Sequence, residues 1–115
     1  MSRKNHHRTA ARRPAQAPIF AALGDQTRLS LVTKLSDGQA RSITQLADGY
    51  KLTRQAITKH LRVLEKAGLV RSIHSGRESL FDFDPKPVKE IKDYLNFVSE
   101  QWEQSLQQLK LFVEE

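Results

Sequence analysis

Basic, amide and hydroxyl side chains recur along residues 54–62 at spacings that would gather them on one side of a helix. At about 100° per residue they fill an arc of roughly 140°, and apolar residues fill the neighbouring arc. Such polar groups are the ones that hydrogen-bond to base edges in the major groove of DNA. The segment therefore predicts a helix with a core side and a DNA-reading side. The polar set is Arg54, Gln55, Thr58, Lys59 and Arg62, and the apolar set is Ile57, Leu61 and Leu64.

An isolated helix with this pattern is more often a surface helix whose charges are simply solvated, so the flanking elements decide between the two interpretations. Thr53 can cap the helix by accepting a hydrogen bond from one of its first backbone N–H groups, and Gly68 is placed to end it. Upstream, Ser42 can cap a helix from Ile43 to about Asp48. Further upstream, Asp25 or Thr27 can open a helix that runs to Gly38.

The residues after Gly68 have the pattern of a two-stranded hairpin with a polar tip. Residues 69–74 and 79–83 are the two strands, and Gly76 in the tip can adopt the positive φ that tight hairpin loops need. His74 and Arg77 then lie at the exposed end of this hairpin and are candidate DNA contacts. Three helices followed by a hairpin predict a mainly α fold with a small β-hairpin, a winged helix-turn-helix.

The C-terminal segment carries apolar residues at steps of three and four from Val88 to Val113. This predicts a helix of about 25 residues, with Pro85 and Pro87 marking its start. So long an apolar stripe needs more surface than one small domain can supply, unless it only covers its own domain. We therefore expect a contact with a second copy, with Trp102 as its anchor. The stripe comprises Ile91, Leu95, Val98, Trp102, Leu106 and Leu109.

Charged residues are unevenly distributed along the 115-residue chain. The net charge of +6 and pI near 9.9 indicate a polyanionic partner. Residues 1–17 hold five basic and no acidic residues, whereas residues 84–115 are net acidic by three. We divide the chain into a flexible basic arm, 1–17, and a winged-helix domain with a C-terminal dimerisation helix, 18–115. The arm either lies along DNA phosphates or is a solubilising tail.

Two segments in this order, 20–38 and 46–70, together with Gly76-Arg77, resemble the arsenic-repressor (ArsR) family of dimeric bacterial winged-helix repressors. The resemblance spans about residues 19–84. It implies that Arg54, Gln55, Thr58 and Lys59 occupy base-reading positions and that the wing around Arg77 reaches phosphate or the minor groove. It also implies that a short first helix joins the last helix in the dimer interface. The residues of that first helix are Ile19, Phe20 and Leu23.

The chain departs from the metal-sensing branch of this family. Ser42 and Thr44 stand where that branch carries a Cys-x-Cys pair, and the chain has no cysteine. The last helix offers Asp93, Glu100 and Glu103 for the family's other metal site, but no histidine. We expect no metal site and no cofactor. His6 and His7 belong to the arm, and structural or phosphate-facing roles are expected for His60 and His74.

The turn shows a smaller departure, because the family often has glycine where Lys51 stands and this chain has Gly49. The end of the preceding helix is therefore left open.

No Gly-rich phosphate loop, cysteine nucleophile or catalytic histidine arrangement is present, so an enzyme is not expected. The longest apolar stretches, such as residues 19–23, are too short for a membrane span, and no apolar signal segment follows the basic N-terminus. We expect a cytoplasmic homodimeric regulator that binds double-stranded DNA, acting as a repressor at a palindromic operator. The alternative is a winged-helix module that docks an acidic protein partner. Binding to double-stranded RNA is disfavoured because its major groove does not admit a helix.

Overall fold

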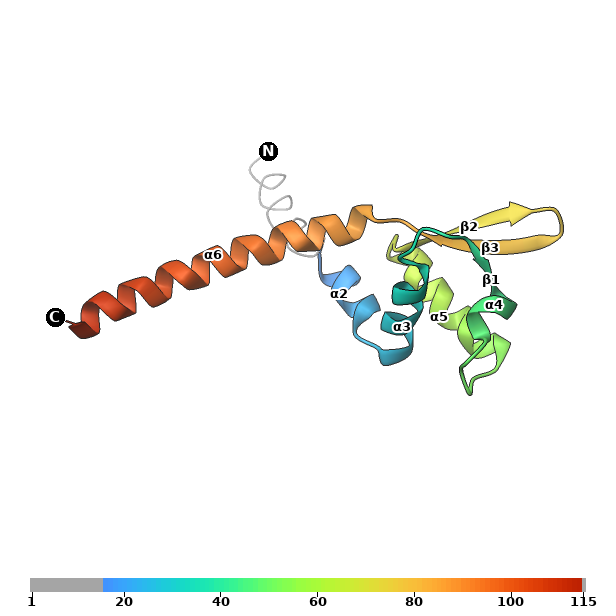
Figure 1. The fold of residues 1–115 in the computed structure, drawn as a ribbon, viewed down its shortest axis with the longest axis horizontal. Helices are drawn as coiled ribbons and strands as arrows, with labels where there is room; N and C mark the ends of the chain where they lie inside the picture. The colour runs from blue at the N-terminus through green and yellow to red at the C-terminus, as the bar shows by residue number, and fades with distance from the viewer. Residues whose placement is uncertain (1–15, 115) are drawn as a thin grey trace, which may run out of the picture.

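The computed structural model describes residues 16–114, which form a winged helix followed by a long helix (Figure 1). The predicted mainly α fold is thus confirmed. The basic arm lies outside the described residues except for its last two, and Ala17 already belongs to the first described helix. The elements in chain order are α2 (Ala17–Leu23), α3 (Gln26–Leu35), β1 (Arg41–Ser42), α4 (Ile43–Ala47), α5 (Arg54–Lys66), β2 (Val70–Ser75), β3 (Glu78–Phe83) and α6 (Lys86–Glu114).

Three short polar side chains begin the helices of the winged-helix body. Asp25 caps α3, since its Oδ2 accepts a hydrogen bond of 3.0 Å from the backbone N–H of Arg28. Ser42 caps α4 in a reciprocal arrangement with Gln45, and Thr53 caps α5 through the backbone N–H of Ala56 at 3.0 Å. Each cap satisfies a backbone donor that has no partner within its own helix.

The turn between α4 and α5 is made by Gly49. Helix α4 ends at Ala47, and Gly49 takes a φ of +89°, which a residue with a side chain rarely adopts. Within residues 16–114 every residue with positive φ is a glycine, so Lys51 has an ordinary backbone conformation. The boundary that the sequence left open is therefore set by Gly49.

The sheet has three strands in the order β1-β3-β2, one more than the predicted hairpin. Strands β2 and β3 pair in antiparallel register from Val70↔Phe83 to Ser75↔Glu78. Strand β1 adds only two residues to the other edge of β3, with Arg41 opposite Phe81. This short pairing ties the start of α4 to the base of the wing.

The core lies between helices α2, α3, α4 and α5, the sheet and the start of α6. Its fully buried side chains include Leu31, Leu46, Leu61 and Phe81. Two residues expected at a dimer interface also belong to this core, because Ile19 is 4% exposed and Ile91 is 8% exposed within the single chain. Their own domain therefore covers these two side chains within the single chain, and their part in a dimer interface stays a prediction.

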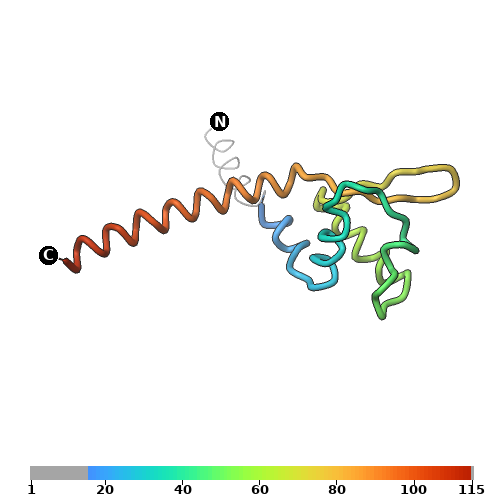
Figure 2. Tube along the Cα trace, viewed as in Figure 1, coloured from blue at the N-terminus to red at the C-terminus, as the bar shows by residue number. Residues whose placement is uncertain are grey.

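Helix α6 begins at Lys86, between the two prolines predicted to mark its start, and runs for 29 residues where about 25 were predicted. Its axis leaves the body in the direction opposite to the β2–β3 hairpin (Figure 2). Only Ile91 is buried along it, while the Tyr94 ring makes an edge contact with Phe20 at 6.1 Å between centroids. No helix within residues 16–114 combines the length and the hydrophobicity that crossing a bilayer requires.

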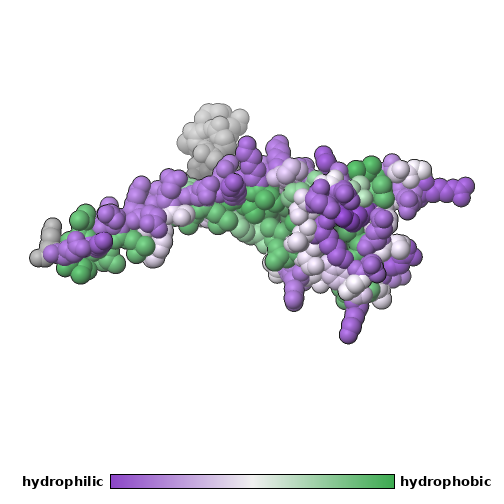
Figure 3. Space-filling model, in the orientation of Figure 1, coloured by the Kyte–Doolittle hydropathy of each residue, from purple (hydrophilic) through white to green (hydrophobic). Residues whose placement is uncertain are grey.

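The exposed residues of α6 are not uniformly polar. Hydrophobic side chains run along one side of the helix and hydrophilic ones along the other (Figure 3). Trp102 is 61% exposed and Phe112 is 76% exposed. A monomer would leave this apolar surface in water, which marks α6 as an interaction surface. The other exposed large apolar residues of α6 are Tyr94, Leu95, Phe97, Val98, Leu106, Leu109, Leu111 and Val113.

One ion pair at the end of α3 makes a pH-dependent contribution to stability. Hydrogen bonds from the Arg41 guanidinium, at 2.7 and 2.9 Å, lower the pKa of Asp37 from 3.8 to about 2. A carboxyl with a lowered pKa stabilises the fold fully above its unfolded value and progressively less as the pH falls toward its folded value. We expect the urea midpoint of the wild type to fall more steeply between pH 4 and pH 2 than that of Asp37→Asn. Parallel pH profiles for the two proteins would refute this role.

Candidate nucleic-acid interface

Helix α5 presents the side chains that the sequence assigned to DNA reading. Its apolar residues Ile57, Leu61 and Leu64 are fully buried. On its other side Arg54, Gln55 and Lys59 are exposed and Thr58 is half-buried. We call Arg54, Gln55, Thr58 and Lys59 the reading surface.

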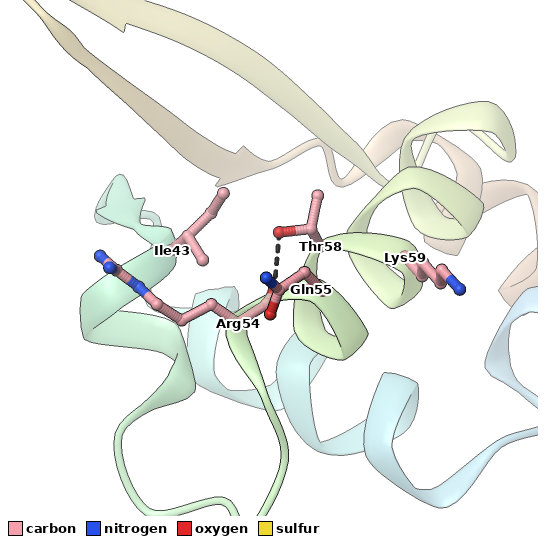
Figure 4. A pocket seen from close by; sticks show the side chains of 5 residues that line it. All are labelled: Ile43, Arg54, Gln55, Thr58 and Lys59. Carbon is pink, nitrogen blue, oxygen red and sulfur yellow. Dashed lines mark hydrogen bonds between the residues drawn. The ribbon is translucent and has the colours of Figure 1, made fainter.

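The four side chains of the reading surface spread in different directions (Figure 4). Arg54 extends toward α4, where its guanidinium donates a hydrogen bond to Thr44 Oγ1, and Lys59 extends the other way. The Thr58 hydroxyl donates to the backbone carbonyl of Arg54 at 2.7 Å. Arg54 is therefore held across the gap between the two helices of the helix-turn-helix.

Arg62 differs from the reading surface because other side chains already engage it. Its guanidinium donates to Glu65 at 2.7 Å and to Ser72 in the wing at 3.4 Å, and it lies over the Phe81 ring at 5.7 Å. Hydrogen bonds from Ser72 and then from Arg62 lower the pKa of Glu65. Arg62 thus links α5 to the wing, so a contact with DNA would be a second role for it.

His74 and Arg77 lie in the wing, and both are exposed. The wing turns through Gly76 and Arg77 between Ser75 and Glu78, which places Arg77 at its tip. Arg71 near the wing base pairs with Asp82 at 3.1 Å, and this contact raises the pKa of Arg71. This ion pair joins the two strands near the base of the wing. The tip of the wing projects away from the body (Figure 1).

A clamp from α3 fixes the turn that leads into α5. Lys34 donates from its Nζ to the carbonyl of Asp48 at 2.8 Å and lies over the Tyr50 ring at 4.4 Å. The hydroxyls of Tyr50 and Ser30 are 2.6 Å apart and share a hydrogen bond. Sequence reasoning missed this clamp because its partners are 14 to 20 residues apart and follow no helical or strand period.

His60 has a structural role on the inner side of α5. Its Nδ1 lies 3.3 Å from Nη1 of Arg28 and 3.7 Å from Oδ2 of Asp25, the cap of α3. The backbone N–H of Arg28 is the main cause of the lowered pKa of Asp25. Of the two roles expected for His60, the structure supports the structural one, since the ring joins α5 to the start of α3.

The positions that carry thiolates in the metal-sensing branch are occupied by residues that make polar contacts of their own. Ser42 caps α4, and Thr44 accepts from Arg54. Among residues 16–114, no three His, Cys, Asp or Glu side chains gather in a group that could hold a metal ion. Neither Ser42 nor Thr44 supplies the soft ligand that the thiolate site needs.

Comparison with known proteins shows the family to which a chain with this arrangement belongs. A model of helix-turn-helix domains matches residues 14–73. The HTH-type transcriptional regulator YuzN of Bacillus subtilis is 39% identical over 79 residues, which cover 64% of this chain and 86% of that protein. The solved ArsR-like transcriptional regulator of Rhodococcus sp. RHA1 is 32% identical, with a TM-score of 0.77 over 89% of this chain and 95% of that one. The chain belongs to the ArsR-like family of helix-turn-helix transcriptional regulators.

Membership of the ArsR-like family confirms the resemblance found in the sequence and the expectation of a DNA-binding regulator instead of an enzyme. The fold is also that of the winged helix-turn-helix domain Mb0332 of Mycobacterium bovis, described as homodimeric. That domain is 21% identical with a TM-score of 0.65 over 82% of this chain and 86% of that one, so this likeness concerns the fold alone.

Proposed function

We propose that this ArsR-like regulator is a cytoplasmic homodimer that represses transcription by placing two copies of α5 in successive major grooves of a palindromic operator. The observation that carries the proposal is the division of α5 into a fully buried apolar side and the exposed reading surface. Arg54, Gln55 and Lys59 would donate to base edges, while Arg77 and His74, both exposed in the wing, would contact phosphate or the minor groove. Arg62 adds positive charge at the junction of α5 and the wing.

The second half of the proposal concerns the dimer. The apolar side of α6 is exposed over most of its length, and Phe20 of α2 adjoins it through Tyr94. A second copy related by a two-fold axis would cover both surfaces at once. We assign the interface to Phe20, Leu23, Leu95, Val98, Trp102, Leu106 and Leu109, with Ile19 and Ile91 supporting it from the core behind.

Selection from random duplexes tests the function. The purified protein should enrich one sequence with two inverted half-sites whose centres are about 34 Å apart, one turn of the duplex. Binding should weaken steeply with salt, because each phosphate contact releases counterions. Sedimentation of the free protein should give a dimer. Weak, unselective binding at low salt together with tight binding to an acidic protein would contradict the proposal.

We also expect the regulator to be insensitive to metals. Zinc, cadmium or arsenite at micromolar concentration should leave the complex with operator DNA intact, because the thiolate positions hold Ser42 and Thr44. Fluorescence anisotropy of labelled operator during a metal titration measures this directly. Stoichiometric metal binding that released the DNA would overturn it and would direct attention to His6 and His7.

A further inference from the structure

A hollow of about 550 Å³ opens on the reading surface between α4 and α5. A smaller hollow of about 210 Å³ adjoins it beneath the wing. Two residues line both, so they form the ridge between the hollows. They are Ile43, the first residue of α4, and Arg54, the first residue of α5. The remaining walls of the larger hollow come from Gln55, Thr58 and Lys59.

Ile43 contributes a side chain without any hydrogen-bonding group to a surface that is otherwise polar. It is half-buried, so part of it stays accessible at the mouth of the hollow. Figure 4 shows Ile43 from α4 and Thr58 from α5 pointing the same way from two different helices. No periodic pattern along the chain indicates this pairing, since Ile43 lies on a different helix from Thr58.

Thr58 adds a second apolar group to the same hollow. Its hydroxyl is committed to the backbone carbonyl of Arg54 at 2.7 Å. This bond uses the hydroxyl hydrogen, so the side chain can offer a ligand its methyl group and an acceptor oxygen, but no donor. Ile43 and the Thr58 methyl group therefore line the same hollow as Arg54, Gln55 and Lys59, and we call this apolar pair the notch.

In the major groove, thymine is the base that presents a methyl group. We infer that the Ile43–Thr58 notch receives the C5-methyl group of one thymine in each operator half-site. This inference rests on the proposed function, because it requires the reading surface to enter the groove. Cytosine at that position lacks the methyl group and leaves the notch unfilled, so the notch selects between the two pyrimidines.

Uracil substitution tests the notch, because uracil differs from thymine only by the missing methyl group. The operator obtained by random selection is resynthesised with each thymine replaced in turn, and affinity is measured by anisotropy. We expect one thymine per half-site to be sensitive, with affinity falling about fourfold for one methyl group and about fifteenfold when both half-sites are changed. Other uracil substitutions should leave the affinity unchanged.

Two variants locate the methyl contact. Thr58→Ser keeps the hydroxyl that bonds the Arg54 carbonyl and removes only the side-chain methyl group, and Ile43→Ala removes the larger wall. In both, the ratio of thymine to uracil affinity at the sensitive position should shrink toward one. Val63→Ala is the matched control: Val63 is an exposed β-branched residue of α5 that lines a different groove, so the full ratio should persist.

Three other outcomes would contradict the inference that the notch receives a thymine methyl group. An operator that binds tightly but shows no uracil-sensitive thymine overturns this inference and leaves the proposed function standing. The inference also fails, with the proposed function intact, if a sensitive thymine keeps its full ratio in both Thr58→Ser and Ile43→Ala. A selection that enriches no sequence overturns the proposed function, and the notch with it.

Discussion

Trp102→Asp should separate the two copies and abolish tight operator binding. Trp102 is 61% exposed in the single chain and lies on the apolar side of α6, so a second copy would bury it. A carboxylate at that position would be an unpaired charge in an apolar interface. We expect monomers or aggregates in sedimentation and a loss of operator affinity of about 10²–10⁴-fold, because the two half-sites no longer bind as one event. Affinity for random DNA should fall much less.

Gln104→Asp is the matched control for that experiment. It adds the same charge two residues further along α6, and at about 100° per residue it lies on the opposite side of the helix. Its dimer and its operator affinity should match the wild type. A Trp102→Asp protein that stayed dimeric would place Trp102 outside the interface. A monomeric variant with undiminished operator affinity would refute the paired arrangement of α5 itself.

Arg54→Ala and Gln55→Ala should relax the choice of base without unfolding the protein. Each loss of a bidentate base contact costs about 1–3 kcal/mol of binding free energy at one position of the operator. Both side chains are exposed, and the core contacts of α5 come from Ile57, Leu61 and Leu64, so thermal unfolding should change little. Repeating the random-duplex selection with each variant shows which position loses its preference.

Arg77→Ala provides the contrast, since it removes the same charge from the wing tip instead of the reading surface. We expect it to weaken binding about equally across sequences and to reduce the salt dependence by about one phosphate contact. If Arg54→Ala behaved like Arg77→Ala, with uniform weakening and an unchanged preferred sequence, Arg54 would be a phosphate contact. Base reading would then belong to the other members of the reading surface.

The length of α6 is the feature that most strongly favours the proposed dimer. Its 29 residues span about 43 Å at about 1.5 Å per residue, and its buried contact with the body is confined to Ile91. Helices in proteins gain most of their stability from packing of an apolar side. We therefore expect the distal half of α6, with Leu106, Leu109 and Phe112, to be well ordered only within the dimer.

Much of this fold follows from local physical chemistry that can be read along the chain. Asp25, Ser42 and Thr53 cap helices because a short polar side chain can satisfy a free backbone N–H, and this needs no distant partner. The helical period of about 3.6 residues separates the buried residues of α5 from its exposed ones. The same period identifies the apolar side of α6. These local rules were sufficient for the helices, the β2–β3 hairpin and their order, and they separate the exposed residues of α5 from its buried ones.

The tertiary structure decided what covers each side chain, because periodicity defines one face of a helix but not the element that packs against that face. Ile91 shares the period of the apolar stripe on α6, and the family resemblance adds Ile19 to the expected interface, yet their own domain buries both. Arg62 shares the period of the reading surface, yet Glu65 and Ser72 engage its guanidinium. Strand β1 and the Lys34 hydrogen bond to the turn join segments far apart in the sequence. Ile43 and Thr58, from two different helices, line one hollow. Such contacts depend on the packing of the whole domain, so only the folded chain specifies them.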